Sequence, residues 1–150
     1  MRVIFKKDTQ PNWIQKLIGW RTYSYFSHVE IWVDDMCYSS VFPRGVRGEK
    51  ADVVFKNPRD WVVVDIDSLG IDKNTIKEWF ELRKGKPYDT RSLVEILEGK
   101  PSSDPEAFNC AESVLCSLQQ AGILTWYDSS RATPEGLYLA LRGLVEGKTQ

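Results

Sequence analysis

Two residues of this chain have the chemistry of a nucleophile and its base. Cys110 lies in the first turn of an amphipathic helix that the segment Phe108–Leu115 predicts. The backbone N–H groups at a helix start are unpaired and the helix dipole is positive there, and both favour a thiolate over a thiol. His28 is the single histidine of the sequence. If the fold brings them together, Cys110 can attack a carbonyl while His28 handles the proton.

The sequence leaves three candidates for the residue that would orient the imidazole. Glu30 lies two positions after His28 and shares its face of a strand, and we interpret it as a neighbouring surface or cleft residue. Ser39 and Ser40 lie on the expected partner strand, where a hydroxyl can accept a hydrogen bond from the ring. A hydroxyl stabilises an imidazolium less than a carboxylate does. Because strand alternation lets only one of the serines face His28, we favour Ser39, with Ser40 and Glu30 as alternatives.

The other two cysteines, Cys37 and Cys116, complete an odd count of three. With no export signal in the sequence, we expect reduced thiols and no disulfide framework. Cys116 follows directly on Val114 and Leu115, and we interpret it as a small core residue of the same helix.

Length and composition predict one ordinary globular domain over residues 1–150. The chain is 42% hydrophobic and 27% charged. Twenty basic residues against 21 acidic ones give a net charge of -1, which predicts no strong attraction to nucleic acid or to an anionic membrane.

Several classes of segment and site are not predicted. The N-terminal residues 1–8 lack the apolar run of a signal peptide, and no stretch reaches the roughly 18 apolar residues of a membrane span. No Gly-rich phosphate loop is present, since residues 45–48 lack its length and its Lys-Ser/Thr ending. No His/Cys cluster has zinc spacing, so we expect neither a metal nor a cofactor.

The first half of the chain is rich in strand patterns. The Asp34-Asp35 spacer predicts a hairpin between two of the strands, and Pro43 to Gly45 is expected to end the second of these. A first helix is expected at 12–20, with Pro11 at its start. The predicted strands are 2–6, 28–33, 36–41, 51–55 and 61–66.

Helix patterns dominate the second half. Thr75-x-x-Glu78 is a capping-box pattern for a helix to about Lys84, and a short helix is expected at 90–97. The Cys110 helix is expected to end at Gly122, and Thr133-Pro134 is expected to begin a last helix to about Val145. Strands first and helices later predict an α+β fold around a mainly antiparallel sheet.

Five motifs together resemble a known family. In chain order they are Ser27-His28-Val29-Glu30-Ile31-Trp32-Val33, Gly45-Val46, Gly85-Lys86-Pro87-Tyr88-Asp89, Asn109-Cys110-Ala111-Glu112-Ser113-Val114 and Thr133-Pro134-x-x-Leu137. Over about residues 10–140, this order resembles the circularly permuted branch of the NlpC/P60 superfamily of papain-like cysteine hydrolases. Within that branch, the chain is most similar to small bacteriophage-type members.

The resemblance implies a papain-like fold in which a His-bearing strand precedes a Cys-bearing helix, with His28 as base and Cys110 as nucleophile. Family members often carry a Glu or another polar third residue on the strand after the histidine strand, where this chain has Ser39-Ser40. The usual Cys-Ser-Glu reads Cys110-Ala111-Glu112 here. Tyr88-Asp89 matches a family signature, and we expect it to anchor a loop against the sheet.

The implied activity is hydrolysis of amide bonds through an acyl-enzyme, on peptide or isopeptide bonds such as those of cell-wall peptidoglycan. An acyltransferase or thioesterase with the same dyad, acting on a peptide or acyl substrate, is an alternative. A catalytically inactive papain-like module that is structural or binds a partner in a phage is another. A phage-encoded protein of this kind would act in the host cytoplasm or in the virion, without membrane insertion.

Overall fold

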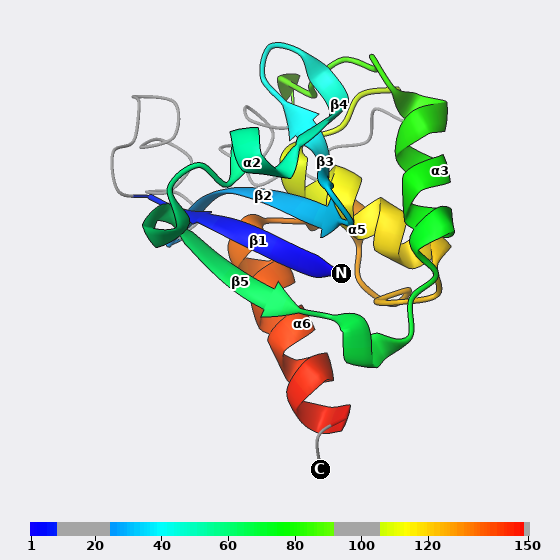
Figure 1. Cartoon of the computed structure of the whole chain (residues 1–150). Helices are drawn as coiled ribbons and strands as arrows, with labels where there is room; N and C mark the ends of the chain where they lie inside the picture. Colours follow the sequence, from blue (N-terminus) through cyan, green and yellow to red (C-terminus); the bar gives the residue numbers. More distant parts are fainter. Residues whose placement is uncertain (9–24, 92–105, 149–150) are drawn as a thin grey trace.

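The computed structural model describes residues 1–8, 25–91 and 106–148. They form a five-stranded sheet in the order β4-β3-β2-β1-β5, in which every neighbouring pair is antiparallel (Figure 1). The strands are β1 Arg2–Lys7, β2 Phe26–Val33, β3 Met36–Val41, β4 Gly45–Lys50 and β5 Trp61–Asp65. The predicted α+β class with an antiparallel sheet is confirmed.

The described ranges also hold α-helices and short 3-10 helices. The α-helices are α2 Ala51–Val54, α3 Lys73–Arg83, α5 Cys110–Gln120 and α6 Pro134–Lys148. The 3-10 helices are η1 Pro58–Asp60, η2 Asp67–Leu69 and η3 Ser129–Arg131. The predicted helix at 12–20 and most of the one at 90–97 lie outside the described residues. No helix within the described ranges combines the length and the apolar character needed to cross a membrane.

The strand predicted at 51–55 is wrong. Ala51 begins a single helical turn, α2, in which Ala51 is buried and Asp52 and Val53 are exposed. The strand that the sequence analysis did not predict is β4. It pairs with β3 along its whole length, with Gly45 opposite Val41. The β-branched pair at 53–54 favours a strand locally, but the hairpin partner of β3 is already supplied by residues 45–50.

The beginning of α3 also differs from the prediction. Asp72 caps this helix by accepting a hydrogen bond from the backbone N–H of Asn74 at 3.0 Å. The hydroxyl of Thr75 donates to the same carboxylate at 3.2 Å, so Thr75 lies inside the helix and the predicted capping box with Glu78 is wrong. The helix begins three residues earlier than predicted, because Asp72 caps the N–H groups of the turn before Thr75.

The Cys110 helix and the last helix begin where the sequence predicts. Asn109 caps α5, and Gly122 follows the Ala121 cap in a left-handed conformation (φ 81°). In α6, Pro134 is the first helical residue, and the helix runs to Lys148, a little past the expected end.

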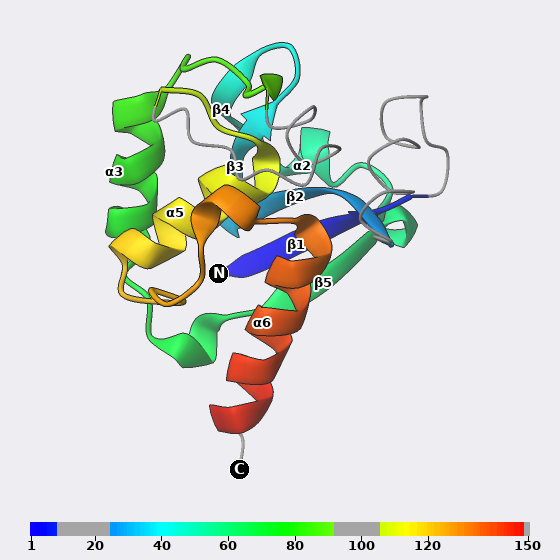
Figure 2. The same cartoon turned by 180° about the vertical axis from the view of Figure 1, so that it is seen from behind.

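The core lies mainly between the sheet and the helices α5 and α6, which Figure 2 shows in front of the sheet. The alternate β2 residues Val29, Ile31 and Val33 are fully buried in this core, together with Val114, Leu115 and Leu118 of α5. A smaller apolar cluster under α2, formed by Ile4, Cys37, Ala51 and Trp61, covers the opposite face. The other alternate residues of β2, His28 and Glu30, therefore point away from the main core.

Candidate active site

Glu30 holds His28 from the same face of β2. The imidazole Nε2 of His28 lies 3.0 Å from Glu30 Oε1, which alternation explains because the residues are two positions apart. The side chain of His28 is 17% exposed and that of Glu30 is only 2% exposed. A carboxylate this deeply buried requires compensating charge.

Arg47 on β4 supplies part of that charge. Its guanidinium donates two hydrogen bonds to Glu30, from Nη1 to Oε2 at 3.1 Å and from Nη2 to Oε1 at 2.7 Å. Burial alone would raise the pKa of Glu30, but the hydrogen bonds and positive charges of His28 and Arg47 lower it below its usual value. Glu30 is therefore an anion that is hydrogen-bonded to two cationic groups, His28 and Arg47.

Cys110 is the second partner of the imidazole. Burial by itself lowers the pKa of His28, but hydrogen bonds to Cys110 and Glu30, together with their negative charge, raise it to about 9. The ring nitrogen engaged by Glu30 is Nε2. An imidazolium beside a cysteine is one of the environments in which reactive thiolates occur.

The first turn of α5 holds the nucleophile in a capping box. Asn109 Oδ1 accepts from the N–H of Glu112 at 2.8 Å, and Glu112 Oε2 accepts from the N–H of Asn109 at 3.4 Å. The N–H of Ser113 reaches the Asn109 carbonyl. The first-turn donors left over by this box are the N–H groups of Cys110 and Ala111, beside the sulfur. Such donors can stabilise an oxyanion.

A buried hydroxyl ties this turn to the sheet. Ser113 Oγ donates to the Cys110 carbonyl at 2.9 Å and accepts from the backbone N–H of Ser40 at 3.0 Å. Ser113 and Ser40 are both fully buried. Strand β3 is thereby linked through one side chain to the residue that carries the thiol.

The expectation that Ser39 orients His28 is corrected by the structure. Ser39 Oγ donates to the Val29 carbonyl at 2.8 Å, and the ring is held by Glu30. The paired part of β2 and β3 ends where Ile31 lies opposite Tyr38, and Ser39 follows directly after that end, where its hydroxyl bonds to the β2 backbone. Glu30 lines a pocket beside His28, as a cleft residue would, but it is also the buried ion-pair partner of the ring and not merely its neighbour.

The backbone of the Tyr88-Asp89 segment is hydrogen-bonded to the residues before α5, whereas we expected it to anchor a loop against the sheet. The N–H of Asp89 donates to the Phe108 carbonyl and the N–H of Phe108 donates to the Pro87 carbonyl, both at 3.2 Å. Burial and the nearby charge of Cys110 raise the pKa of Tyr88. The segment therefore joins the loop after α3 to the residues directly before Cys110.

The same segment also rests on β4. The N–H of Val46 donates to the Lys86 carbonyl and that of Gly85 donates to the Val46 carbonyl, each at 2.9 Å. Gly45 has a left-handed φ of 74°, and a Cβ there would lie 2.0 Å from the Lys86 oxygen. Only glycine fits this close approach. Gly45-Val46, Gly85–Asp89 and the residues before Cys110 thus form one hydrogen-bonded path from the sheet edge to the nucleophile.

A pocket of about 250 Å³ opens beside His28. The residues that line it come from β1, β2, the β3–β4 hairpin, α2 and β5, and Cys110 is not one of the described residues lining it. They are Lys6, His28, Glu30, Val41, Arg44, Arg47, Glu49, Val53, Val54 and Trp61.

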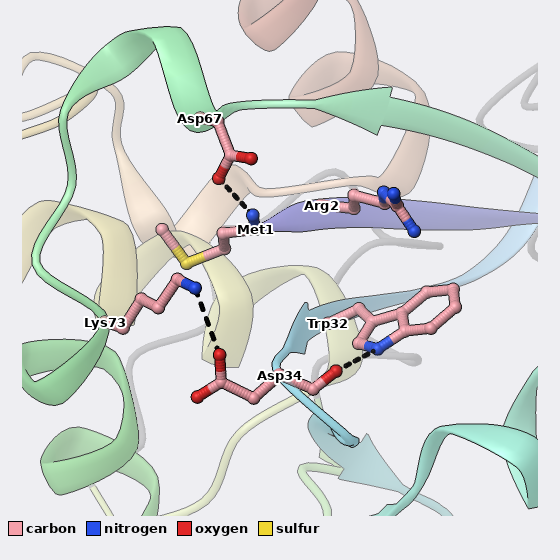
Figure 3. A pocket seen from close by; sticks show the side chains of 6 residues that line it. All are labelled: Met1, Arg2, Trp32, Asp34, Asp67 and Lys73. Atoms are coloured by element: carbon pink, nitrogen blue, oxygen red, sulfur yellow. Dashed lines mark hydrogen bonds and ion pairs between the residues drawn. The ribbon is translucent and has the colours of Figure 1, made fainter.

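A second pocket, of about 180 Å³, lies near the other end of β2 and carries no such chemistry (Figure 3). Both of its carboxylates are paired within the pocket: Asp67 with the N-terminal ammonium and Asp34 with Lys73 at 3.0 Å. The indole of Trp32 donates to the Asp34 carbonyl. Arg2 lies over the Trp32 ring and 3.9 Å from Asp65 outside the pocket.

The three cysteines occupy different environments and are all free. Burial raises the pKa of Cys37 to about 12, and the nearby charge of Glu30 acts in the same direction. Burial also raises the pKa of Cys116, which packs partly against the core, as expected for a structural residue. Cys110 alone has the imidazole as its partner.

Sequence reasoning missed Asn109, Glu112 and Arg47. The pattern Asn109-x-x-Glu112 could have been found, because it matches a capping box directly before an apolar run. Arg47 had no local signal, since it lies 17 positions from Glu30 and reaches it only through the pairing of β3 with β4.

No protein-family model matches this chain, and no curated protein matches it.

Proposed function

We propose that this chain is a cysteine hydrolase of amide bonds, with Cys110 as nucleophile, His28 as acid and base, and Glu30 as the residue that orients His28. The observation that carries the proposal is the placement of His28 between the buried carboxylate of Glu30 and the thiol at the start of α5. The resemblance to permuted NlpC/P60 enzymes supports it, with peptide or isopeptide bonds, including those of peptidoglycan, as substrates.

The first half of the reaction forms an acyl-enzyme. The thiolate of Cys110 attacks the carbonyl carbon, and the N–H groups of Cys110 and Ala111 stabilise the oxyanion. The proton on His28 then passes to the leaving nitrogen, the C–N bond breaks and the amine departs.

The second half restores the resting charges. Neutral His28 takes a proton from water while the water oxygen attacks the thioester carbonyl, and the C–S bond breaks to release the acid. His28 is again an imidazolium and Cys110 again a thiolate. Glu30 keeps the ring in place through both halves and stabilises the protonated form.

In this proposal the third polar residue comes from the histidine strand itself. Glu30 and His28 share β2, and Arg47 on β4 neutralises the carboxylate. A carboxylate at this position stabilises an imidazolium better than the hydroxyl of Ser39 could.

The test is the pH dependence of alkylation by iodoacetamide, read for each cysteine by peptide mass. We expect Cys110 to react well below the pKa of about 8.5 of an ordinary thiol and His28→Asn to slow it at least roughly tenfold at pH 6.5. Cys116 and Cys37 are internal controls that the substitution leaves unchanged. Labelling in urea checks that all three peptides are recovered.

Slow labelling of Cys110 that does not depend on His28, in a protein whose circular dichroism is native, would overturn the proposal. Activity gives the second criterion. On any amide substrate that the chain cleaves, we expect Cys110→Ser to reduce the rate by about a thousandfold or more, and Cys116→Ser to leave it unchanged.

A further inference from the structure

Among the described residues that line the pocket beside His28, the charge of Lys6 has no partner of opposite sign. Arg47 is paired with Glu30, and Arg44 lies 3.6 Å from Glu49. Lys6 lines the same pocket, is exposed, and forms no ion pair with any residue of the described ranges. A bound anion is what such a cation can attract.

Lys6 is next to the proposed acid–base residue. It lies opposite His28 on β2 and opposite Trp61 on β5, so the three residues form a row across the sheet. Directly opposed residues share a face, and the rings of His28 and Trp61 are 6.4 Å apart. Lys6 therefore lies between His28 and Trp61 in this row, on the face of the sheet that carries both rings.

The remaining wall of the pocket is apolar. Val53 and Val54 of α2 and Val41 at the end of β3 line it together with Trp61. Its volume of about 250 Å³ is below the range of drug-sized ligand sites, so it suits one group the size of an amino acid. An apolar wall and a free cation together fit a side chain attached to a carboxylate.

His28 also fixes which half of the substrate lies here. In amide hydrolysis the imidazolium gives its proton to the leaving amine, so the amine half must lie on the His28 side of the thiol. We propose that the pocket binds the carboxylate and apolar side chain of an amino-acid-like leaving group, with Lys6 as the carboxylate partner. This inference rests on the proposed hydrolase function and narrows its substrates to amides whose amine half carries a free carboxylate.

Two alkylating reagents of equal size test the charge. Iodoacetate and iodoacetamide differ by one negative charge, and the ratio of their rates at Cys110 reports the attraction of an anion. We expect Lys6→Met to lower this ratio roughly threefold to tenfold at low salt. Lys7→Met is the matched control, because Lys7 donates to the Arg59 carbonyl and does not line the pocket among the described residues.

The occupant is tested by protection of Cys110 from iodoacetamide. We expect L-leucine to slow labelling and leucinamide not to, and we expect Lys6→Met to abolish the difference. A rate ratio that is the same in Lys6→Met and Lys7→Met, or equal protection by leucine and leucinamide, overturns the inference. Failure of the hydrolase proposal is distinct, because it appears as slow iodoacetamide labelling that does not depend on His28.

Discussion

The two faces of β2 are buried against different partners. Val29, Ile31 and Val33 pack against α5 in the apolar core, while His28 and Glu30 on the other face join a buried chain of charges that ends at Arg47. The apolar face is stabilised by many non-directional contacts, whereas each charge depends on one or two directional bonds. Removing a single side chain should therefore lower the free energy of unfolding more on the charged face than on the apolar face.

Glu30→Leu should give the largest effect on stability. The substitution leaves Arg47 buried without its carboxylate, and we expect the free energy of unfolding to fall by about 3–5 kcal/mol. Ile31→Val on the opposite face should cost only about 0.5–1.5 kcal/mol. Urea denaturation measures both.

The double variant Glu30→Leu with Arg47→Met separates a lost charge partner from lost packing. We expect it to recover much of the loss, since an ion pair replaced by apolar groups leaves no uncompensated charge. If Glu30→Leu alone lowered the free energy of unfolding by less than about 1 kcal/mol, the two faces of β2 would not differ as we expect.

The pH dependence of stability should come from the charged face. The pKa of His28 is about 9 in the folded protein against 6.5 for the unperturbed group. The raised pKa means that protonated His28 adds up to about 3 kcal/mol to the free energy of unfolding. This contribution is fully present below pH 6.5 and is lost as the pH rises through about 9. Urea unfolding of the wild type and His28→Asn at pH 6, 7.5 and 9.5 should show a difference that shrinks with pH. A difference that is constant over this range would mean that the proton on His28 is not held by Glu30 and Cys110.

Ser113→Ala should destabilise the protein less than Glu30→Leu, and it tests the side-chain link between β3 and α5. It removes the hydroxyl that joins the Ser40 N–H to the Cys110 carbonyl, and leaves the former a buried donor without its acceptor. We expect a loss of about 1–3 kcal/mol and slower Cys110 alkylation. Ser117→Ala is the matched control, because Ser117 donates to the Val114 carbonyl within the same helix. If Cys110 were alkylated at the same rate in Ser113→Ala and Ser117→Ala, Ser113 would contribute to stability only and would not position the thiol.

Local patterns predicted most elements that position the site. The alternation of β2 and β3, the Asp34-Asp35 turn and the start of α6 at Pro134 are properties of a few neighbouring residues, and the structure agrees with them. Strand β4 escaped prediction because Gly45, Gly48 and the charged residues between and after them carry no strand pattern. Its pairing with β3 is a tertiary effect that overrides weak propensity.

The sequence by itself determined that Cys110 would begin a helix and that His28 would lie near the start of a strand, because caps and alternation act over a few residues. Only the tertiary structure decided that the imidazole is held by Glu30 and not by Ser39, and that Arg47 completes the chain of charges. The reason is register: the alignment of β2, β3 and β4 sets which side chains face one another, and many contacts distant in the sequence fix that alignment together.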